Sequence, residues 1–438
     1  MPQIPDLFAY QETGKAWLME QTTAMLADQP GLGKTAQAIA AARDISAGHF
    51  NAKICVICPR SAVKNWHREL KRFWPGHTPD QDLVTTFERV ANTQHPANAA
   101  FNKLDWDFII IDEAHRLKTP DAQRTQAVYK RVYQLLNRWR GGLKPHPTRV
   151  WLLTGTPAKN HAGELYTHLA VLRPELIQDR SGRVMSQAQF EEKYCNVGFD
   201  KHGHRRIRGS KNITDLRAIL DASGFFLRRL KKQVQPDLPP LIFDTYPLNF
   251  TGRVGGAPNL EHLEGWTIED ALNFLQENQS NLAQWQHDVA SVKVPLVKEF
   301  LETELDTPGE KIICFYHHRI LGEELKNLLA LYQPVLVDGR TAEPQDQVDE
   351  FQNNPNCRLF LGQIQACGEA LNITAATQVA FAEYSWSPSD NYQAACRAHR
   401  YGLQNTLITR FLYLDNSTDE IVARVVERKT AELAELFD

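Results

Sequence analysis

The chain has 438 residues, of which 42% are hydrophobic and 23% charged, a balance typical of a globular protein rather than a disordered or fibrous one. Chains of this length form two or three domains, because one hydrophobic core stops growing at about 250 to 300 residues. The formal net charge of -3 excludes a generally basic protein, so any affinity for a polyanion must come from local basic patches.

No apolar run approaches the roughly 18 residues that a membrane span needs. The first residues, Met1 to Glu20, lack the basic leader and apolar centre of a secretory signal. We therefore expect no membrane association and a protein that stays inside the cell.

Short apolar runs rich in Ile, Val and Phe alternate with longer stretches of helical period, which is typical of parallel sheets joined by crossover helices. The expected strands form two groups, one ending near Thr154 and one beginning near Lys311. They are residues 53–58, 107–111, 149–153, 311–316, 358–362, 377–383 and 406–413. The pattern predicts an α/β fold with two lobes.

The interval between the two groups differs in character from both. Residues 186–240 are predicted to be helical, with a basic, glycine-containing turn at Lys201-His-Gly-His-Arg-Arg-Ile-Arg-Gly-Ser-Lys211. Four glycines and a proline in 251–265 place a lobe boundary near 245–290. The predicted domains are an N-terminal lobe over 1–245 with a helical protrusion at about 175–240, a linker over 246–290, and a C-terminal lobe over 291–438 that opens on a helix at 291–305.

The end of the chain carries a helix signal. Ser417-x-x-Glu420 is a capping box, and the apolar residues behind it share one stripe of a helix. These residues are Ile421, Val422, Val425 and Val426. We predict a C-terminal helix that closes the second lobe.

The seven cysteines are scattered, and only Cys55 and Cys58 have C-x-x-C spacing. Both lie in an expected buried strand, where residues three apart face opposite sides. A structural zinc site also needs a second ligand pair. We therefore expect reduced, buried thiols rather than a zinc site.

Asp28-Gln-Pro-Gly-Leu-Gly-Lys-Thr35 precedes an expected helix over 36–42 and has the pattern of a phosphate loop, with Ala27 taken as its first position. Gly31 and Gly33 let the backbone bend closely around phosphate oxygens. The free N–H groups and the dipole at the start of the helix favour an anion. The segment therefore predicts a nucleotide site.

The expected cofactors are ATP and Mg²⁺. In a phosphate loop, Lys34 reaches the β- and γ-phosphates and Thr35 ligates Mg²⁺. Asp107-Phe-Ile-Ile-Ile-Asp-Glu-Ala-His115 places two carboxylates at the end of an apolar strand, the position where open α/β sheets bind ligands. Because a buried acid without a partner is unfavourable, a cation is its natural partner. Asp112 would hold Mg²⁺ through water, and Glu113 would orient or deprotonate the attacking water.

Two further segments are candidates for contact with the phosphates. Thr154 and Thr156 follow an apolar strand and would sense the phosphates, unless this is a simple strand-to-turn exit. In Gln393-Ala-Ala-Cys-Arg-Ala-His-Arg400, a helix would place Arg397 and Arg400 on one face. Opposite a phosphate loop such a pair acts as arginine fingers, whereas on a plain surface it is a solvated face.

The stretch between Asp121 and Glu164 contains no acidic residue. Its eight cations would repel one another unless they are solvated or face phosphates. They are Arg124, Lys130, Arg131, Arg138, Arg140, Lys144, Arg149 and Lys159. The stretch favours a polyanion partner, and a solvated helix remains the alternative.

In their order along nearly the whole chain, these motifs resemble superfamily-two helicases, specifically the Swi/Snf-type ATPases. Three segments carry the likeness to this branch: Leu227-Arg-Arg-Leu-Lys-Lys232 leading to Leu238-Pro-Pro240, Gly368-Glu-Ala-Leu-Asn-Ile-Thr374, and Arg397-Ala-His-Arg-Tyr-Gly402. Within the branch, Tyr194-Cys195, the basic turn and Ser291-Val-Lys-Val-Pro295 are most similar to the fork-remodelling, annealing-helicase group. Gln29, Pro30 and Ala370 depart from the family's usual residues.

The resemblance implies two RecA-like lobes with a helical protrusion, and an ATP-dependent translocase or remodelling motor on double-stranded or branched DNA that hydrolyses ATP at the cleft between its lobes. Gln11 would read adenine. The residues expected along the DNA are Pro59, Arg60 and Ser61 in the first lobe and His317 and Asn372 in the second, the last two being equally interpretable as core or capping residues. Arg205, Arg206 and Arg208 are expected to contact phosphates, because they cluster on a glycine-flanked turn without acids.

The alternatives are a strand-separating DNA or RNA helicase and a catalytically weak DNA-binding scaffold. The retained Lys34, Asp112, Glu113, Arg397 and Arg400 argue against the scaffold. A replication or repair protein is a candidate partner, and we expect a monomer. Its place would be the nucleus of a eukaryote, or the nucleoid in the cytoplasm if its source is prokaryotic or viral.

Overall fold

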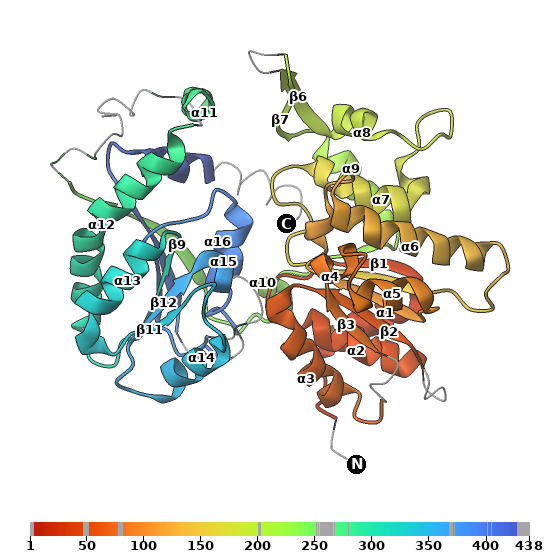
Figure 1. Cartoon of the computed structure of the whole chain (residues 1–438), viewed down its shortest axis with the longest axis horizontal. Helices are drawn as coiled ribbons and strands as arrows, with labels where there is room; N and C mark the ends of the chain where they lie inside the picture. Colours follow the sequence, from red (N-terminus) through yellow and green to blue (C-terminus); the bar gives the residue numbers. More distant parts are fainter. Residues whose placement is uncertain are drawn as a thin grey trace. The chain divides into compact units, whose positions relative to one another are not determined.

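The structure is a computed structural model. It describes residues 4–46, 52–77, 82–199, 203–250, 268–278, 280–367, 373–400 and 405–426, together with residues 252, 254, 266, 371, 402 and 403. These residues form two compact units that divide after Pro236. Each unit is built on a six-stranded parallel sheet with helices on both faces (Figure 1). Among the described residues, no helix combines the length and apolar character needed to cross a bilayer.

The sheet of the first unit has the strand order β3-β2-β4-β5-β1-β8. Its strands are β1 (Thr23–Leu26), β2 (Ile54–Cys58), β3 (Leu83–Thr86), β4 (Phe108–Asp112), β5 (Arg149–Leu153) and β8 (Phe226–Leu227). The three strands predicted in this half, at 53–58, 107–111 and 149–153, are confirmed. They lie at the centre of the sheet, where cover on both faces requires an almost continuous apolar run.

Ten α-helices are described in the first unit. They are α1 (Ala9–Glu20), α2 (Lys34–Ile45), α3 (Val63–Phe73), α4 (Phe87–Ala91), α5 (Pro96–Lys103), α6 (Gln123–Arg140), α7 (Tyr166–Leu172), α8 (Gln187–Tyr194), α9 (Ile213–Ala222) and α10 (Lys231–Val234). Short 3₁₀ helices occur at η1 (Arg60–Ala62), η3 (Ala114–Leu117), η4 (Ala162–Leu165) and η5 (Pro174–Ile177). Helix α6 shows why these segments are helical: it buries Val128, Val132 and Leu135 on one stripe against the sheet.

The segment at 186–240, predicted as helical with a basic turn at 201–211, contains a hairpin. Strands β6 (Cys195–Phe199) and β7 (Arg205–Ser210) pair antiparallel between α8 and α9 (Figure 1). Gly203, with φ of 78°, lies in the turn between them. Helix was the wrong prediction here. Val197 and Phe199 have the spacing of two that belongs to a strand, and Ile207 of β7 lies opposite Val197.

The sheet of the second unit has the strand order β11-β12-β10-β13-β14-β9. Its strands are β9 (Leu241–Leu248), β10 (Ile312–Tyr316), β11 (Val335–Val337), β12 (Leu359–Gln363), β13 (Gln378–Phe381) and β14 (Leu407–Leu414). The four strands predicted in this half are confirmed. Successive residues of β10 enter separate apolar clusters, with Ile313 and Phe315 in one and Ile312 and Cys314 in the other, so both faces of this sheet are buried.

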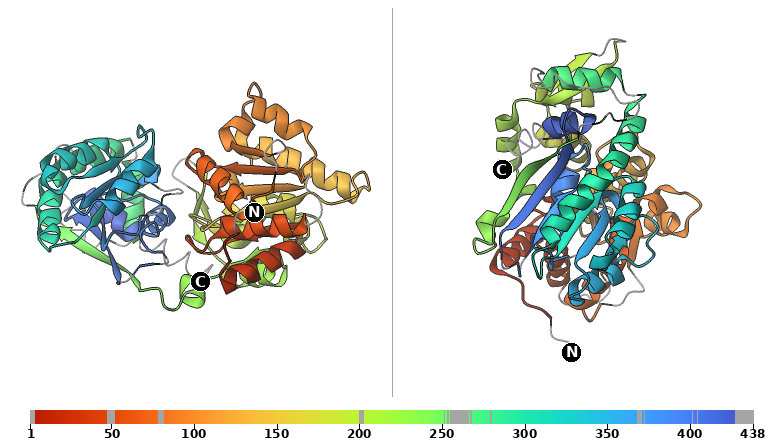
Figure 2. Two further views of the ribbon diagram at one scale, coloured as in Figure 1. Left: turned by 90° about the horizontal axis from the view of Figure 1, so that it is seen from below. Right: turned by 90° about the vertical axis from the view of Figure 1, so that its left-hand side faces the viewer.

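The residues of β9 were divided between the predicted N-terminal lobe and the predicted linker, but the strand pairs with β14 from Leu241 opposite Leu407 to Leu248 opposite Leu414. The right-hand view of Figure 2 shows these two long strands side by side. The predicted boundary at residue 245 therefore falls inside β9. Asp244, Thr245 and Pro247 interrupt the apolar residues of this edge strand, which hides it from a search for apolar runs.

The second unit also contains α11 (Ile268–Glu277), α12 (Leu282–Leu305), α13 (Arg319–Leu328), α14 (Pro344–Asn353), α15 (Ile364–Cys367), α16 (Pro388–Ala395) and the 3₁₀ helix η7 (Ala330–Tyr332). Helix α12 was predicted to start at residue 291. It starts at Leu282, inside the predicted linker, and continues through Pro295.

The predicted C-terminal helix is present from residue 418 to the end of the described chain at 426. Ser417 Oγ accepts a hydrogen bond from the Asp419 amide at 3.1 Å, which caps the helix start. All four residues of its apolar stripe are buried. All seven cysteines are free and buried, as predicted.

Candidate functional site

The candidate residues of the first unit follow the strands of its parallel sheet. The phosphate loop follows β1, Pro59 follows β2, Asp112 ends β4 and Thr154 follows β5. Because these strands are parallel, their carboxyl ends meet at one edge, which is where open α/β sheets bind ligands.

The phosphate loop has the backbone of an anion cradle. Gly31 and Gly33 have φ of 92° and 73°, a region that residues with a Cβ rarely adopt. A Cβ on Gly33 would also lie 2.3 Å from Gln11 Nε2, so a larger residue there would displace the Gln11 side chain. Counting back from Gly33 places Asp28 at the first position of the eight-residue pattern. The assignment of that position to Ala27 was wrong by one residue.

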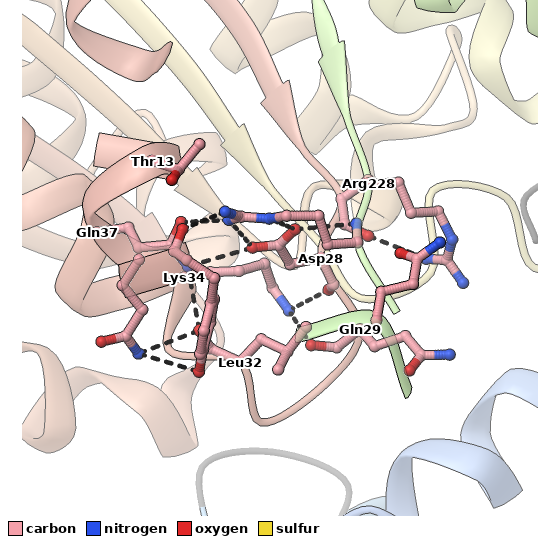
Figure 3. A network of polar contacts seen from close by, with 12 residues as sticks. Thr13, Asp28, Gln29, Leu32, Lys34, Gln37 and Arg228 are labelled. Atoms are coloured by element: carbon pink, nitrogen blue, oxygen red, sulfur yellow. Dashed lines mark hydrogen bonds and ion pairs between the residues drawn. The ribbon is translucent and has the colours of Figure 1, made fainter. Parts of the chain in front are cut away.

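The Lys34 side chain folds back onto the phosphate loop that precedes it. Its Nζ donates to the carbonyl oxygens of Asp28 at 2.8 Å and Gln29 at 3.4 Å (Figure 3). Desolvation lowers the pKa of the Lys34 ammonium, and nearby carboxylates, Glu113 first, oppose that shift. The folded unit thus brings Lys34 close to the acidic pair. Thr35 is the second residue of α2 and half-buried.

Asp112 is fixed by two hydrogen bonds. Its Oδ2 accepts from Trp66 Nε1 at 2.8 Å, and its Oδ1 accepts from the Glu113 amide at 3.0 Å. Burial, and then the carboxylate of Glu113, raise the pKa of Asp112 to about 7. Two acids held this close favour a cation between them. Glu113 has φ of 49°, an uncommon conformation that functional sites often retain.

Trp66 was missed by the sequence interpretation. It lies on α3 and is fully buried. A single Trp within a helix gives no indication that its indole N–H reaches a carboxylate 46 residues further along the chain.

The end of β5 contacts the acidic motif through His115. Its Nδ1 lies 3.3 Å from Thr154 Oγ1 and 3.2 Å from Glu113 Oε2. Thr154 Oγ1 also accepts from the Thr156 amide at 3.1 Å. Burial lowers the pKa of His115, so the ring is neutral at pH 7. Thr154 is fully buried and touches the acidic motif through this ring.

Arg397 and Arg400 belong to the second unit. Helix α16 ends at Ala395, so both arginines lie in the segment that follows it. The helical condition for placing them on one helix face is therefore not met. Burial first, and then the guanidinium of Arg397, lower the pKa of Arg400 to about 9. The Arg400 side chain therefore stays protonated at neutral pH. Two partly desolvated cations side by side favour an anionic ligand.

The residues predicted along DNA differ in exposure. Arg60 and Ser61 are exposed on η1, while Pro59 is buried. His317 follows β10, where its amide donates to Glu383 Oε2 at 2.8 Å and its carbonyl accepts from Gln363 Nε2 at 3.0 Å. Both contacts use the main chain of His317 rather than its side chain. Asn372 lies outside the described residues.

The three arginines predicted on an acid-free turn lie on strand β7 instead. Arg205 forms an ion pair with Glu191 of α8 and donates to the Ala188 carbonyl at 3.3 Å. The expectation of a cluster without acids is therefore wrong for Arg205. Arg206 and Arg208 are both exposed and, two residues apart on a strand, share the other face.

Several cations of the acid-free stretch between 122 and 163 bind other groups of the protein rather than being available to a polyanion. Arg131 and Arg138 reach Asp105 from α6, at 3.6 Å and 2.5 Å. Lys144 Nζ donates to the Trp106 carbonyl at 2.6 Å, and Arg149 Nη1 donates to the Gln21 carbonyl at 2.8 Å. Arg124 Nε also donates to the Arg116 carbonyl at 2.9 Å. At least five of the eight cations thus have structural partners within the unit.

Comparison with known proteins agrees with this organisation. The SNF2-related domain matches residues 10–80 and 77–252, and the helicase conserved C-terminal domain matches residues 293–402. The chain belongs to the SNF2-related family. Its two parallel α/β sheets are the two RecA-like lobes of a helicase-like ATPase of this family, and the resemblance to the Swi/Snf-type ATPases is confirmed.

Relatives of this SNF2-family chain match almost all of it. It is 27% identical over 99% of its length to the SWI/SNF-related matrix-associated actin-dependent regulator of chromatin subfamily A-like protein 1 of Drosophila melanogaster. It is 26% identical over 97% of its length to the DNA annealing helicase and endonuclease ZRANB3 of Homo sapiens. The chain spans 56% and 40% of these relatives.

The chain is also similar to a solved structure, the Sulfolobus solfataricus SWI2/SNF2 ATPase core in complex with dsDNA. The two sequences are 23% identical, and the TM-score is 0.43. The match covers 99% of this SNF2-family chain and 96% of the solved chain.

Proposed function

We propose that this chain is an ATP-dependent motor that translocates on double-stranded DNA. The observation that carries the proposal is the meeting of Lys34, Asp112 and Glu113 at the carboxyl edge of the first sheet. Membership of the SNF2-related family supports it, and so do relatives whose names describe a DNA annealing helicase.

The phosphate loop fits ATP and Mg²⁺. Its two left-handed glycines and the start of α2 form a cradle of backbone N–H groups. Lys34 would hold the β- and γ-phosphates, and Gln11, which approaches Gly33 closely, would read the adenine. Thr35 and Asp112 would hold Mg²⁺, which supplies charge neutralisation of the phosphates when bound.

The remaining catalytic roles belong to Glu113 and to the two arginines of the second unit. Glu113 would orient or deprotonate the attacking water. Arg397 and Arg400 would stabilise the charge that develops on the transferring phosphoryl group. In such motors nucleotide binding closes two lobes and hydrolysis reopens them, which would convert turnover into steps along DNA.

Contacts to DNA would come from both units and from the hairpin. The proposed residues are Pro59, Arg60, Ser61, Arg206, Arg208, His317 and Asn372, with Arg205 contributing only if it exchanges its partner Glu191. Contacts of this kind read phosphates rather than bases. We therefore propose a motor without sequence preference, acting on plain or branched duplex DNA.

The experiment that tests this proposal is the ATPase rate measured without nucleic acid and with single strand, duplex, fork and RNA. Duplex or fork should stimulate hydrolysis most. Stimulation by single strand or RNA alone would favour a strand-separating helicase, and a rate that no nucleic acid changes would favour a scaffold.

Trp66→Phe should lower DNA-stimulated ATP turnover by about 10- to 100-fold, the range for groups that orient a metal ligand. Phenylalanine keeps the apolar packing but removes the indole N–H that holds Asp112 Oδ2. The matched control is Trp106→Phe, which removes a buried indole hydrogen bond to the Phe101 carbonyl elsewhere in the unit. Steady-state hydrolysis should separate the two variants, and an equal effect of both would contradict the role of Trp66.

Replacing Arg205, Arg206 and Arg208 together with Ala should flatten the dependence of DNA affinity on salt by up to about 0.9 per lost phosphate contact, measured as the slope of log affinity against log salt. Because Arg205 is already paired with Glu191, Arg205→Ala alone should change the slope least. A triple variant with the slope of the unmodified protein would remove the hairpin from the DNA surface.

A further inference from the structure

We infer that Arg229 is a positioning residue that holds the two sides of the nucleotide site, the phosphate loop and the Gln11 end of α1, in one arrangement. The inference rests on the proposed binding of ATP. It concerns a residue that none of the catalytic roles above uses, in the segment that ends the first unit.

Sheet topology brings Arg229 to the phosphate loop. Strand β8 pairs with β1, with Leu227 opposite Leu26. The ladder continues past both strands, since the Ala27 amide donates to the Leu227 carbonyl at 2.7 Å and the Gln29 amide donates to the Arg229 carbonyl at 3.1 Å. The residues that follow β8 therefore run beside the phosphate loop.

Asp28 is the anchor of this arrangement. Its side chain is fully buried, and a buried carboxylate requires a partner. Arg229 supplies it: the main-chain amide donates to Asp28 Oδ1 at 3.1 Å, Nε donates to the same oxygen at 2.9 Å, and Nη2 bonds Oδ2. The phosphate-loop pattern has glycine at the position that Asp28 occupies. In this chain the loop therefore contains a carboxylate that binds Arg229.

The same guanidinium reaches α1 and α2. Nη2 donates to Gln37 Oε1 at 2.7 Å, and Nη1 bonds the Tyr10 carbonyl. Gln37 Nε2 returns to Asp28 Oδ2 at 3.2 Å and to the Leu32 carbonyl at 3.0 Å (Figure 3). One side chain thus links the helix that carries Gln11 with the helix that starts at Lys34.

Gln11 shares an acceptor with this network. Its Nε2 donates to the Leu32 carbonyl at 3.3 Å, the oxygen that Gln37 also uses. Gly14 of α1 leaves space for the side chains of Gln37 and Arg229. A Cβ at this position would lie 1.9 Å from Gln37 Oε1 and 2.5 Å from Arg229 Nη2. The closeness of these contacts leaves the network little freedom to rearrange.

Arg228 does not duplicate the role. Its Nη1 donates to the carbonyls of Ala27 at 2.9 Å and Gly155 at 3.2 Å. Arg228 therefore binds main-chain carbonyls that follow β1 and β5. Arg229 instead binds the side chains of Asp28 and Gln37 and a carbonyl at the start of α1.

The test compares Arg229→Gln with the double variant Asp28→Asn/Arg229→Gln. The single variant leaves a buried carboxylate without its cation and is expected to be strongly destabilised. The double variant removes both charges and should recover most of the lost thermal stability. It still lacks the guanidinium that joins Asp28, Tyr10 and Gln37, so it isolates positioning from folding.

We expect the folded double variant to bind ATP at least tenfold more weakly than the unmodified protein. Its preference for ATP over GTP should shrink toward that of Gln11→Ala, and its affinity for inorganic tripolyphosphate should fall less than its affinity for ATP. The matched control is Arg217→Gln/Asp221→Asn, the same exchange in an ion pair on α9, which should change none of the three affinities.

If the double variant keeps the ATP affinity and the preference for ATP over GTP of the unmodified protein, the proposed function still stands but this inference is wrong. An equal loss of ATP, GTP and tripolyphosphate affinity would overturn it as well, because a general loosening of the fold predicts that result. If ATP binding by the unmodified protein does not depend on Lys34, the proposed function fails and the inference fails with it.

Discussion

Glu113→Gln is expected to abolish ATP turnover while leaving ATP affinity close to that of the unmodified protein. The amide keeps the size of the carboxylate but cannot take a proton from water. The phosphate loop is untouched, because Lys34 donates to main-chain carbonyls of its own loop rather than to Glu113.

Lys34→Ala is the counterpart of this experiment. It removes the cation that should hold the β- and γ-phosphates, so affinity itself should fall. Equilibrium binding of ATP and steady-state hydrolysis must be measured separately, with Glu88→Gln, an exposed acid on α4, as a matched control. Normal turnover by either Lys34→Ala or Glu113→Gln would contradict the proposed site.

Arg400→Ala should lower turnover by about a thousandfold or more, the scale for arginine fingers, and Arg397→Ala should act in the same direction. Both guanidinium groups are partly desolvated and adjacent, which lowers the pKa of Arg400 to about 9. Such a pair is suited to a phosphoryl group that becomes more negative during transfer. Affinity for DNA without nucleotide should change much less.

The control for these variants is Arg424→Ala in the same unit. Arg424 pairs with Glu420 one helical turn away at 2.8 Å, and a partly exposed pair of this kind contributes little. Turnover should stay within about twofold of the unmodified protein. A parallel loss of turnover and DNA affinity in Arg400→Ala would instead indicate damage to the fold or a contact with DNA.

The elements that were predictable from sequence are those with continuous apolar runs. All seven expected strands are present, because central parallel strands must be apolar on both faces. Strands β1, β3, β8 and β11, which have two to four residues, were not predicted. Strand β9 was missed because Asp244, Thr245 and Pro247 interrupt its apolar residues.

The predicted motif residues of the first unit were brought together because each follows a strand of one parallel sheet. Their supporting contacts could not be predicted in the same way. Trp66 and Asp112 are 46 residues apart, and Arg229 and Asp28 are 201 apart. Pairing at such separations depends on strand order, which the sequence pattern does not specify. The partner of Arg205 was missed for a different reason, since Glu191 lies outside the turn that was considered.

Movement along intact duplex DNA is the central claim, and displacement of a third, triplex-forming strand tests it most directly. ATP should drive removal of that strand from the duplex, while a partially single-stranded duplex stays paired, and Lys34→Ala should show neither reaction. Unwinding of the paired duplex with the triplex left intact would contradict the account and establish a strand-separating helicase instead.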